Sequence, residues 1–187
     1  HCRAEDAIGS LPACDLVYID PQRRSERGRV TGLDEASPAV TYLLPRLLDK
    51  AARVIIKASP MLDIDAACHQ LGCVAGVHIV EYAAGVRELV FDCHRGTQNG
   101  PVRIHANIIN YDGAVLNGLV VDWPEDATAP LCEEPATYLY EPAPAIMKSQ
   151  CFKTLASRYK LAKLAPATHL FTARHYVAAF PGTIYTI

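Results

Sequence analysis

The sequence contains no uninterrupted apolar run long enough to span a bilayer, although half of its 187 residues are hydrophobic. No signal-peptide layout opens the chain, which begins at His1. The seven cysteines are odd in number and form no CxxC pair, so a disulfide framework is not expected. These absences predict a cytoplasmic protein with reduced thiols, a sizeable core and no membrane partner. Because the chain also opens without a helix or strand start of its own, we expect a fragment of a longer protein.

Acidic residues are missing from the end of the chain. After Glu141 there is no Asp or Glu, whereas basic residues contribute +6 to a net charge of −2, so the first 141 residues carry −8. A basic segment without acids is typical of a polyanion partner, and His169 and His175 could also contact phosphate. A basic face that is only solvated explains the pattern equally well. The six basic residues are Lys148, Lys153, Arg158, Lys160, Lys163 and Arg174.

Signatures of hydrolases and of metal sites are absent too. The sequence has no Gly-x-Ser-x-Gly and no Ser-His-Asp arrangement. Cys68, His69 and Cys73 have loosely metal-like spacing, but no fourth ligand is near in the sequence. Cysteines beside a helix end belong more often to a core, so we predict no metal site.

One stretch organises the rest of the chain. An apolar run up to Ile19 is followed at once by Asp20-Pro21, which predicts a buried strand that ends at the proline. In a parallel sheet, ligands bind beyond the carboxyl ends of the strands. Asp20 therefore marks a candidate ligand edge, with Arg23 and Arg24 beside it as phosphate-binding groups. The alternative is an acid that only caps the next turn.

Strands and helices alternate in the first third of the chain, which predicts a parallel sheet with right-handed crossovers. His1 to Asp6 resembles the end of a strand, and the polar stretch 22–32 predicts an exposed loop. Ser37-Pro38 and Ser59-Pro60 each predict a helix start, and Pro45 should kink or break the first helix. The expected elements are a strand at Asp15–Ile19, a helix from Ser37 to Leu48, a strand at Ala52–Lys57 and a helix from Ser59 to about Leu71.

The remainder of the chain predicts mostly strands. Val74–Tyr82 and Val86–His94 are joined too closely for a crossover, so they should form an antiparallel hairpin around Gly85. A second hairpin is expected across Tyr111-Asp112-Gly113. Its strands are Val102–Asn110 and Ala114–Asp122. The tail should contain a strand at Thr137–Tyr140, a helix at Pro144–Tyr159, a strand at Thr168–Phe171, a short helix around Arg174–Phe180 and a strand at Thr183–Ile187.

These residues resemble a known family. Asp20-Pro21 occupies the place of an Asp-Pro-Pro-Tyr-type motif, and a sheet that closes in an antiparallel hairpin resembles the end of a class I S-adenosylmethionine-dependent methyltransferase. Asp-Pro-Gln-Arg-Arg and the stretch from Ile56 to Asp63 are similar to a bacterial group with a THUMP-like C-terminal domain. Tyr138-Leu-Tyr-Glu-Pro142, the segment 162–171 and Phe180-Pro-Gly182 resemble that THUMP-like domain.

The resemblance implies an α/β fold. A truncated Rossmann-like methyltransferase sheet ending in the hairpin would occupy residues 1–96. A ferredoxin-like hairpin segment and loop would follow at 97–136, and a THUMP-like domain at 137–187. The resemblance also implies roles for single residues: Asp20 and Pro21 in catalysis, Asp6 and Asp20 in cofactor binding, and Arg23, Arg24 and Lys57 in binding a substrate phosphate. A strand-end lysine that only extends to solvent explains Lys57 equally well.

Two departures from the family change what is expected. The Gly-rich loop that opens the methyltransferase fold is absent from this sequence, so the fragment should bind S-adenosylmethionine poorly and be inactive by itself. Gln22-Arg23 replaces the Pro-Tyr or Pro-Phe pair that stacks on a flipped base, which argues against an exocyclic amine as methyl acceptor.

Three functions fit these observations. The first is a methyltransferase acting on RNA, such as tRNA or rRNA, with Lys153 and Lys160 on the helix face that contacts phosphate. The second is a non-catalytic RNA- or protein-binding module on a degenerate methyltransferase scaffold. The third is a methyltransferase for a small molecule or a protein, with a purely structural tail. The sequence does not define the oligomeric state.

Overall fold

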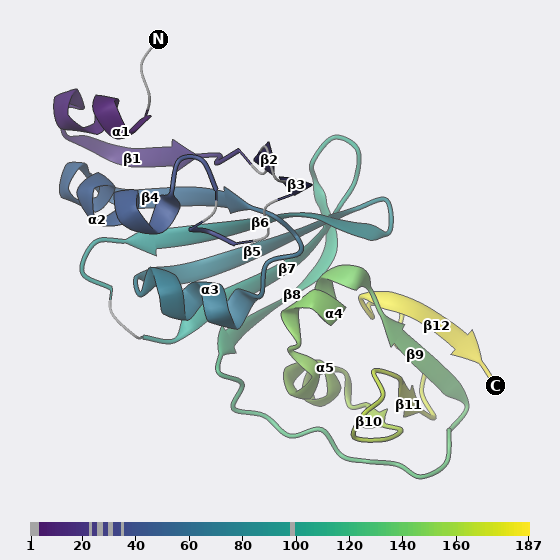
Figure 1. The fold of residues 1–187 in the computed structure, drawn as a ribbon. Helices are drawn as coiled ribbons and strands as arrows, with labels where there is room; N and C mark the ends of the chain where they lie inside the picture. The colour runs from purple at the N-terminus through teal and green to yellow at the C-terminus, as the bar shows by residue number, and fades with distance from the viewer. Residues whose placement is uncertain (1–3, 23, 26–27, 30–31, 35, 98–99) are drawn as a thin grey trace. The chain divides into compact units, whose positions relative to one another are not determined.

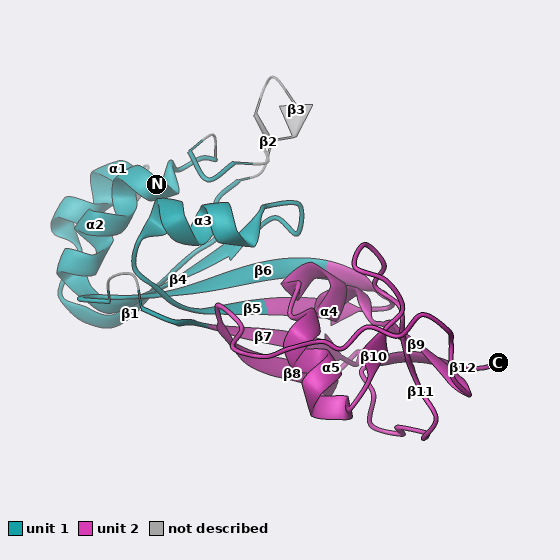
Figure 2. Cartoon of the chain, turned by 90° about the horizontal axis from the view of Figure 1, so that it is seen from below, with its two compact units in different colours: residues 1–78, 87–102 teal, residues 79–86, 103–187 magenta. Residues whose placement is uncertain are grey.

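The structure, a computed structural model, describes residues 4–22, 24–25, 28–29, 32–34, 36–97 and 100–187 (Figure 1). The chain forms two compact units, residues 1–78 with 87–102 and residues 79–86 with 103–187 (Figure 2). The fold is mixed α/β, as the sequence predicts. The domain boundaries expected near residues 96 and 136 stay predictions, because compact units and family domains need not share their limits.

The first unit contains most of the alternating strands and helices, and two long strands run through both units. The elements are α1 (Ala4–Ala7), a 3-10 turn η1 (Ile8–Ser10), β1 (Cys14–Ile19), β2 (Arg24–Ser25), β3 (Gly28–Arg29), α2 (Val40–Lys50), β4 (Ala51–Ala58), α3 (Ile64–Leu71), β5 (Val74–Tyr82) and β6 (Gly85–His94).

The second unit adds the last two strands of the large sheet and a small sheet of its own. Its further elements are β7 (Val102–Ile109), β8 (Val115–Trp123), β9 (Tyr138–Pro142), α4 (Pro144–Ser149), α5 (Phe152–Tyr159), β10 (Ala162–Lys163), β11 (Phe171–Ala173) and β12 (Gly182–Thr186). The small sheet has the order β10-β11-β9-β12, and β11 and β12 both pair antiparallel with β9.

The large sheet has six strands in the order β1-β4-β6-β5-β7-β8. β1 and β4 are parallel neighbours with Ile19 opposite Ile56, which confirms the predicted strand–helix–strand unit. β6 pairs antiparallel with β4, so the parallel sheet continues into the predicted hairpin. The hairpin turns at Ala83 and Ala84, which both have positive φ, rather than around Gly85, which already belongs to β6.

One face of the sheet in the first unit is covered by helices. Figure 2 shows α2 and α3 on the same side of its strands. Val54, Ile56 and Ala58 of β4 are buried, and α2, which packs against β4, buries an apolar stripe of its own. Burying one such aliphatic side chain stabilises the fold by about 1.5–3 kcal/mol. The buried residues of α2 are Val40, Leu43, Leu44 and Leu47.

The prediction that β1 is a buried strand was wrong. β1 is the first strand in the sheet order, and Leu16 and Tyr18 are 45% and 57% exposed. Their partners in β4, Arg53 and Ile55, lie on the sheet face opposite the one that α2 covers. The apolar run therefore forms a strand, but burial also requires a neighbouring element that the described residues do not provide.

The predicted helix starts at the two Ser-Pro pairs were also wrong. Ser37 pairs with Gln22 through its backbone, and α2 begins only at Val40 with no side-chain cap. α2 then continues through Pro45 without a break. α3 is capped by Asp63, whose carboxylate accepts a 2.8 Å hydrogen bond from the Ala66 amide, and it ends at Gly72 as predicted.

Other local predictions need correction. Residues 4–7 are helical rather than the end of a strand, while residues 1–3 lie outside the described part of the chain. Part of the expected loop at 22–32 forms the short antiparallel pair β2–β3. The expected helix Pro144–Tyr159 is divided into α4 and α5 at Gln150, which adopts the left-handed conformation. Residues 174–181 contain turns and no helix, and the strand expected at Thr168–Phe171 lies at β11.

Two carboxylates organise the helices of the second unit. Glu81 is only 4% exposed and accepts a 2.7 Å hydrogen bond from the Ala145 amide at the start of α4. Glu125 accepts from the amides of Lys153 and Thr154 at the start of α5, at 3.3 and 2.5 Å. The free backbone amides at the start of both helices thus donate to carboxylates from outside the helix. These contacts hold both helices against the core of the second unit. The largest side chains of that core are Tyr140, Phe171, Ile79, Leu119, Ile146, Leu155 and Leu161.

Candidate functional site

The carboxyl ends of β1 and β4 bring Asp20 and Lys57 together. Because Ile19 lies opposite Ile56 in the parallel pair, Asp20 and Lys57 follow at the same edge of the sheet. The Lys57 Nζ lies 2.6 Å from Asp20 Oδ2, and the two side chains are 27% and 44% exposed. A carboxylate and an ammonium group therefore stand accessible at the edge where parallel sheets bind ligands.

The ion pair fixes the charge of Lys57. The hydrogen bond to Asp20 raises the pKa of Lys57 above its usual range and outweighs partial burial, which acts in the opposite direction. The charges of Asp20 and Glu88 raise this pKa further. Lys57 is consequently protonated at neutral pH and can hold an anionic group while it orients the Asp20 carboxylate.

The other residues predicted for this site have different positions. Pro21 is buried directly behind Asp20, where it ends the strand. Asp6 is exposed in α1, a separate element. Arg23 lies outside the described residues, and Arg24 is described only as a backbone position of β2. The structure therefore joins Asp20, Pro21 and Lys57, whereas the roles of Asp6, Arg23 and Arg24 stay predictions.

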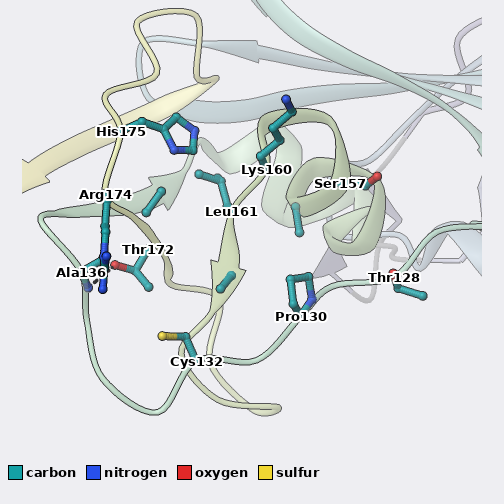
Figure 3. A pocket seen from close by; sticks show the side chains of 13 residues that line it. Thr128, Pro130, Cys132, Ala136, Ser157, Lys160, Leu161, Thr172, Arg174 and His175 are labelled. Atoms are coloured by element: carbon teal, nitrogen blue, oxygen red, sulfur yellow. Dashed lines mark hydrogen bonds between the residues drawn. The ribbon is translucent and has the colours of Figure 1, made fainter.

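Lys153 and Lys160 lie at opposite ends of α5. Lys153 lies in the first turn of the helix, whereas Lys160 follows its last residue and adopts the left-handed conformation. Lys160 also lines a pocket together with Arg174 and His175 (Figure 3). The sequence indicated the basic tail, but it gave no sign that the turn after β11 would face the end of α5.

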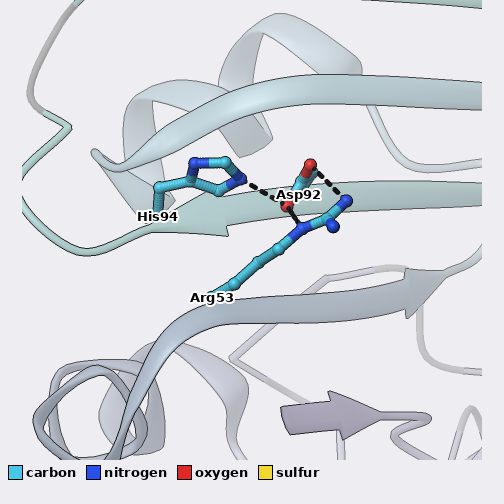
Figure 4. Close-up of polar contacts among 3 residues, drawn as sticks. All are labelled: Arg53, Asp92 and His94. Atoms are coloured by element: carbon cyan, nitrogen blue, oxygen red, sulfur yellow. Dashed lines mark hydrogen bonds and ion pairs between the residues drawn. The ribbon is translucent and has the colours of Figure 1, made fainter. Parts of the chain in front are cut away.

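A second polar cluster was not predicted from the sequence. Arg53 binds Asp92 through two hydrogen bonds of 2.7 and 2.8 Å, and His94 Nε2 lies 2.9 Å from the same carboxylate (Figure 4). The bond to Asp92 raises the pKa of Arg53. Arg53 is near the amino end of β4, away from the edge that carries Lys57. The cluster therefore ties β4 to β6 rather than forming part of the candidate site; its only sequence signal is the alternation of Asp92 and His94 on β6.

Sites for metals and for membrane insertion can be tested on the described residues. Among them, no three His, Cys, Asp or Glu side chains gather as metal ligands would. No helix in the described ranges is long and apolar enough to cross a membrane. In the same part of the chain, Cys14, Cys68, Cys73, Cys93, Cys132 and Cys151 are free thiols.

Fold and site together define a class: a parallel α/β sheet that closes in an antiparallel hairpin, with charged groups at its ligand-binding edge, followed by a small α+β domain. Comparisons with known proteins agree with this class. Residues 138–181 match a family of ferredoxin-like domains. The chain therefore contains a ferredoxin-like C-terminal domain, which falls within the segment predicted as THUMP-like.

A solved structure is similar over nearly the whole chain. It is the crystal structure of a putative methyltransferase from Porphyromonas gingivalis W83, with 31% sequence identity and a TM-score of 0.79. The match covers 92% of this chain but 43% of that one, so this chain spans less than half the length of its relative. A comparison with curated proteins finds no match.

Proposed function

We propose that this chain is the acceptor-side part of an S-adenosylmethionine-dependent methyltransferase that acts on RNA in a bacterial cytoplasm. The observation that carries the proposal is the Asp20–Lys57 pair at the carboxyl edge of a parallel sheet, in a chain similar to the crystal structure described above. The free thiols of the described cysteines are consistent with a reducing compartment.

The residues of this chain fit one side of a methyl-transfer site. S-adenosylmethionine supplies an activated methyl group when it is bound, so the protein must mainly position the nucleophile and accept its proton. Asp20 is placed to accept a hydrogen bond or a proton from a nucleophile at the strand end. Lys57 holds this carboxylate in place and offers a positive charge to a nearby phosphate. Asp6, if it serves the cofactor, would accept from the adenine amino group.

RNA as the acceptor is supported by the basic tail. No acid follows Glu141, whereas the tail carries six basic residues, and all of it lies in the second unit. Lys153 and Lys160 are exposed at the two ends of α5. Polyphosphate backbones are bound by surfaces of this kind, with an affinity that falls steeply as salt rises.

The proposal can be tested by methyl transfer from labelled S-adenosylmethionine to total RNA, with the protein expressed from its full reading frame. Asp20→Asn should lower the transfer rate by about 10²- to 10³-fold, because a neutral amide cannot take the proton. Asp15→Asn is the matched control, since Asp15 lies on the same strand, away from its carboxyl end, and should leave the rate unchanged. Equal rates for the two variants would contradict the role of Asp20.

Calorimetry with S-adenosylmethionine separates this proposal from the second candidate, a non-catalytic binding module. Heat of binding and protection against thermal unfolding support an enzyme. No heat and no protection in the full-length protein would instead support a scaffold that has lost catalysis.

A further inference from the structure

The second unit contains a pocket that the methyl-transfer site does not explain. It has a volume of about 530 Å³ and is formed by the loop 128–136, the end of α5 and the turn after β11 (Figure 3). Volumes of this size hold small organic ligands in other proteins. All of its walls belong to one compact unit, so its shape does not depend on how the two units are arranged.

The pocket is lined by apolar residues and by basic residues. Pro130, Leu161 and several alanines form the apolar part, whereas Lys160, Arg174 and His175 supply basic side chains. None of the described residues that line the pocket is acidic. A ligand that matches this lining has an apolar, preferably flat, body and an anionic group, because unpaired positive charges attract anions and an apolar surface does not.

Some polar residues of the pocket already have hydrogen-bond partners within the protein, whereas others do not. Thr172 Oγ1 accepts from the Ala136 amide at 2.7 Å and donates to the Tyr138 carbonyl at 2.8 Å, so it holds the wall together. His175 Nε2 lies 3.2 Å from the Tyr159 carbonyl and donates to it, so Nδ1 of the neutral ring is an acceptor for a hydroxyl or amino group of a ligand and not a donor to a phosphate. Lys160 and Arg174 are exposed and make no ion pair with any described residue. Their charges are therefore available.

The turn that carries Arg174 and His175 is held in place from the core. The buried Tyr140 hydroxyl donates to the His175 carbonyl at 2.6 Å and accepts from the Val177 amide at 3.1 Å. A basic turn fixed in this way is preorganised, so a ligand does not have to order it on binding.

We propose that this pocket binds a nucleoside phosphate, with the base on the apolar wall and the phosphate on Arg174. Lys160 lies on a different side of the pocket (Figure 3) and would hold a neighbouring phosphate when the nucleotide belongs to a strand. Arginine fits both parts of such a ligand, since its planar guanidinium stacks on bases and binds phosphate oxygens in pairs. The nucleotide is either free or an unpaired nucleotide of an RNA strand. The RNA case rests on the proposed function, whereas the free nucleotide does not.

Binding can be measured on this chain by NMR titration with adenosine monophosphate, adenosine and inorganic phosphate. The monophosphate should bind about tenfold more tightly than either of its parts, and should shift the amides of residues 160–162 and 173–175. The double variant Lys160→Gln/Arg174→Gln should lose about tenfold in affinity. Arg46→Gln/Lys50→Gln removes the same charge from α2 of the first unit and should bind as the wild type. Thermal unfolding of both variants checks that they are folded.

A single-stranded oligouridylate of about eight nucleotides distinguishes the two sources. If RNA is the ligand, it binds more tightly than the mononucleotide, and the slope of log affinity against log salt falls by about 1.4 in the Lys160/Arg174 variant, since each single-strand phosphate contact contributes about 0.7. Equal affinities of mononucleotide and oligomer assign a free nucleotide. Binding of neither, or equal losses in the two double variants, overturns the proposal. No methyl donor enters these measurements, so the methyl-transfer proposal can fail while the pocket stands.

Discussion

Tyr140 serves two parts of the second unit at once. Its ring is fully buried on β9 against Phe180, while its hydroxyl holds the backbone of residues 175 and 177. Burial raises the pKa of Tyr140, so the hydroxyl keeps its proton and can donate at neutral pH. A side chain of the core thus also determines the path of a surface turn.

Replacing Tyr140 by Phe should destabilise the protein by about 0.5–1.5 kcal/mol, since the His175 carbonyl and the Val177 amide lose their part-buried hydrogen bonds to the hydroxyl. Urea unfolding measures the loss, and hydrogen exchange at the Val177 amide should accelerate most. Tyr185→Phe is the control, because the Tyr185 hydroxyl bonds Glu141 at the surface and its loss should leave stability nearly unchanged. An equal effect of the two substitutions would contradict the role given to Tyr140.

Cysteine reactivity should follow burial. Burial raises the pKa of Cys151 from 9.0 to about 11 and that of Cys68 to about 12, so at pH 8 roughly one Cys151 in a thousand is a thiolate. Iodoacetamide should therefore modify the exposed Cys14 well before Cys151, as peptide mass spectrometry would show. The raised pKa favours the protonated thiol in the folded state. Its contribution to stability is complete below pH 9 and is lost between pH 9 and about 11.

Single residues of the candidate site could be predicted to different extents. Asp20 could be found because an acid followed by proline marks a strand end, and Lys57 because it ends the next strand. The pairing of the two depends on register, which the sequence did not fix. Arg174 and His175 lie in a turn where the sequence predicts a helix, so their position beside the same pocket as Lys160 could not be predicted.

At the scale of elements, α5 depends on a residue far away in the sequence. Glu125 lies in the loop after β8, yet it accepts from two amides at the helix start. Its negative charge also favours the positive end of the helix dipole. Because these two amides are occupied, they are not available to bind a phosphate.

Glu125→Gln should cost about 1 kcal/mol, since the amide has one acceptor oxygen and no charge. The midpoint of urea unfolding gives the loss, and circular dichroism gives the helicity. Asp126→Asn removes the same charge from the neighbouring, exposed residue and should have little effect. If Asp126→Asn were as damaging, general charge balance rather than capping would be responsible.

Strands were easier to predict than helix ends. β5, β7 and β8 lie within a residue or two of their expected limits, because alternation and tight turns act locally. Helix ends depended on distant partners: Gln22 holds Ser37 in an extended bridge, and Glu125 allows a new helix to start after Gln150. Neither contact can be inferred from neighbouring residues.

At the scale of the whole molecule, the sheet of the first unit is covered unevenly. Helices lie over one face, whereas Leu16 and Tyr18 on the other face are half exposed in the outermost strand of the described residues. An edge strand with apolar side chains is a surface on which chains associate. We therefore expect this chain to self-associate as its concentration rises.

The double variant Leu16→Lys/Tyr18→Lys should reduce that association, because charges on an edge strand oppose pairing. Sedimentation velocity at increasing concentration is the measurement. Tyr42→Lys/Met61→Lys is the control, since both residues are at least as exposed but lie outside the sheet. Association that persists unchanged in the Leu16/Tyr18 variant would place the contact on another surface.

The double attachment of Tyr140 has a consequence for how the protein would behave in a living cell. Warming that loosens the core around Tyr140 also releases the turn beside the pocket, so binding of the proposed nucleotide and stability of the second unit should decline together. A mild substitution at this position is therefore expected to produce a conditional allele, functional in the cold and defective a few degrees above normal growth.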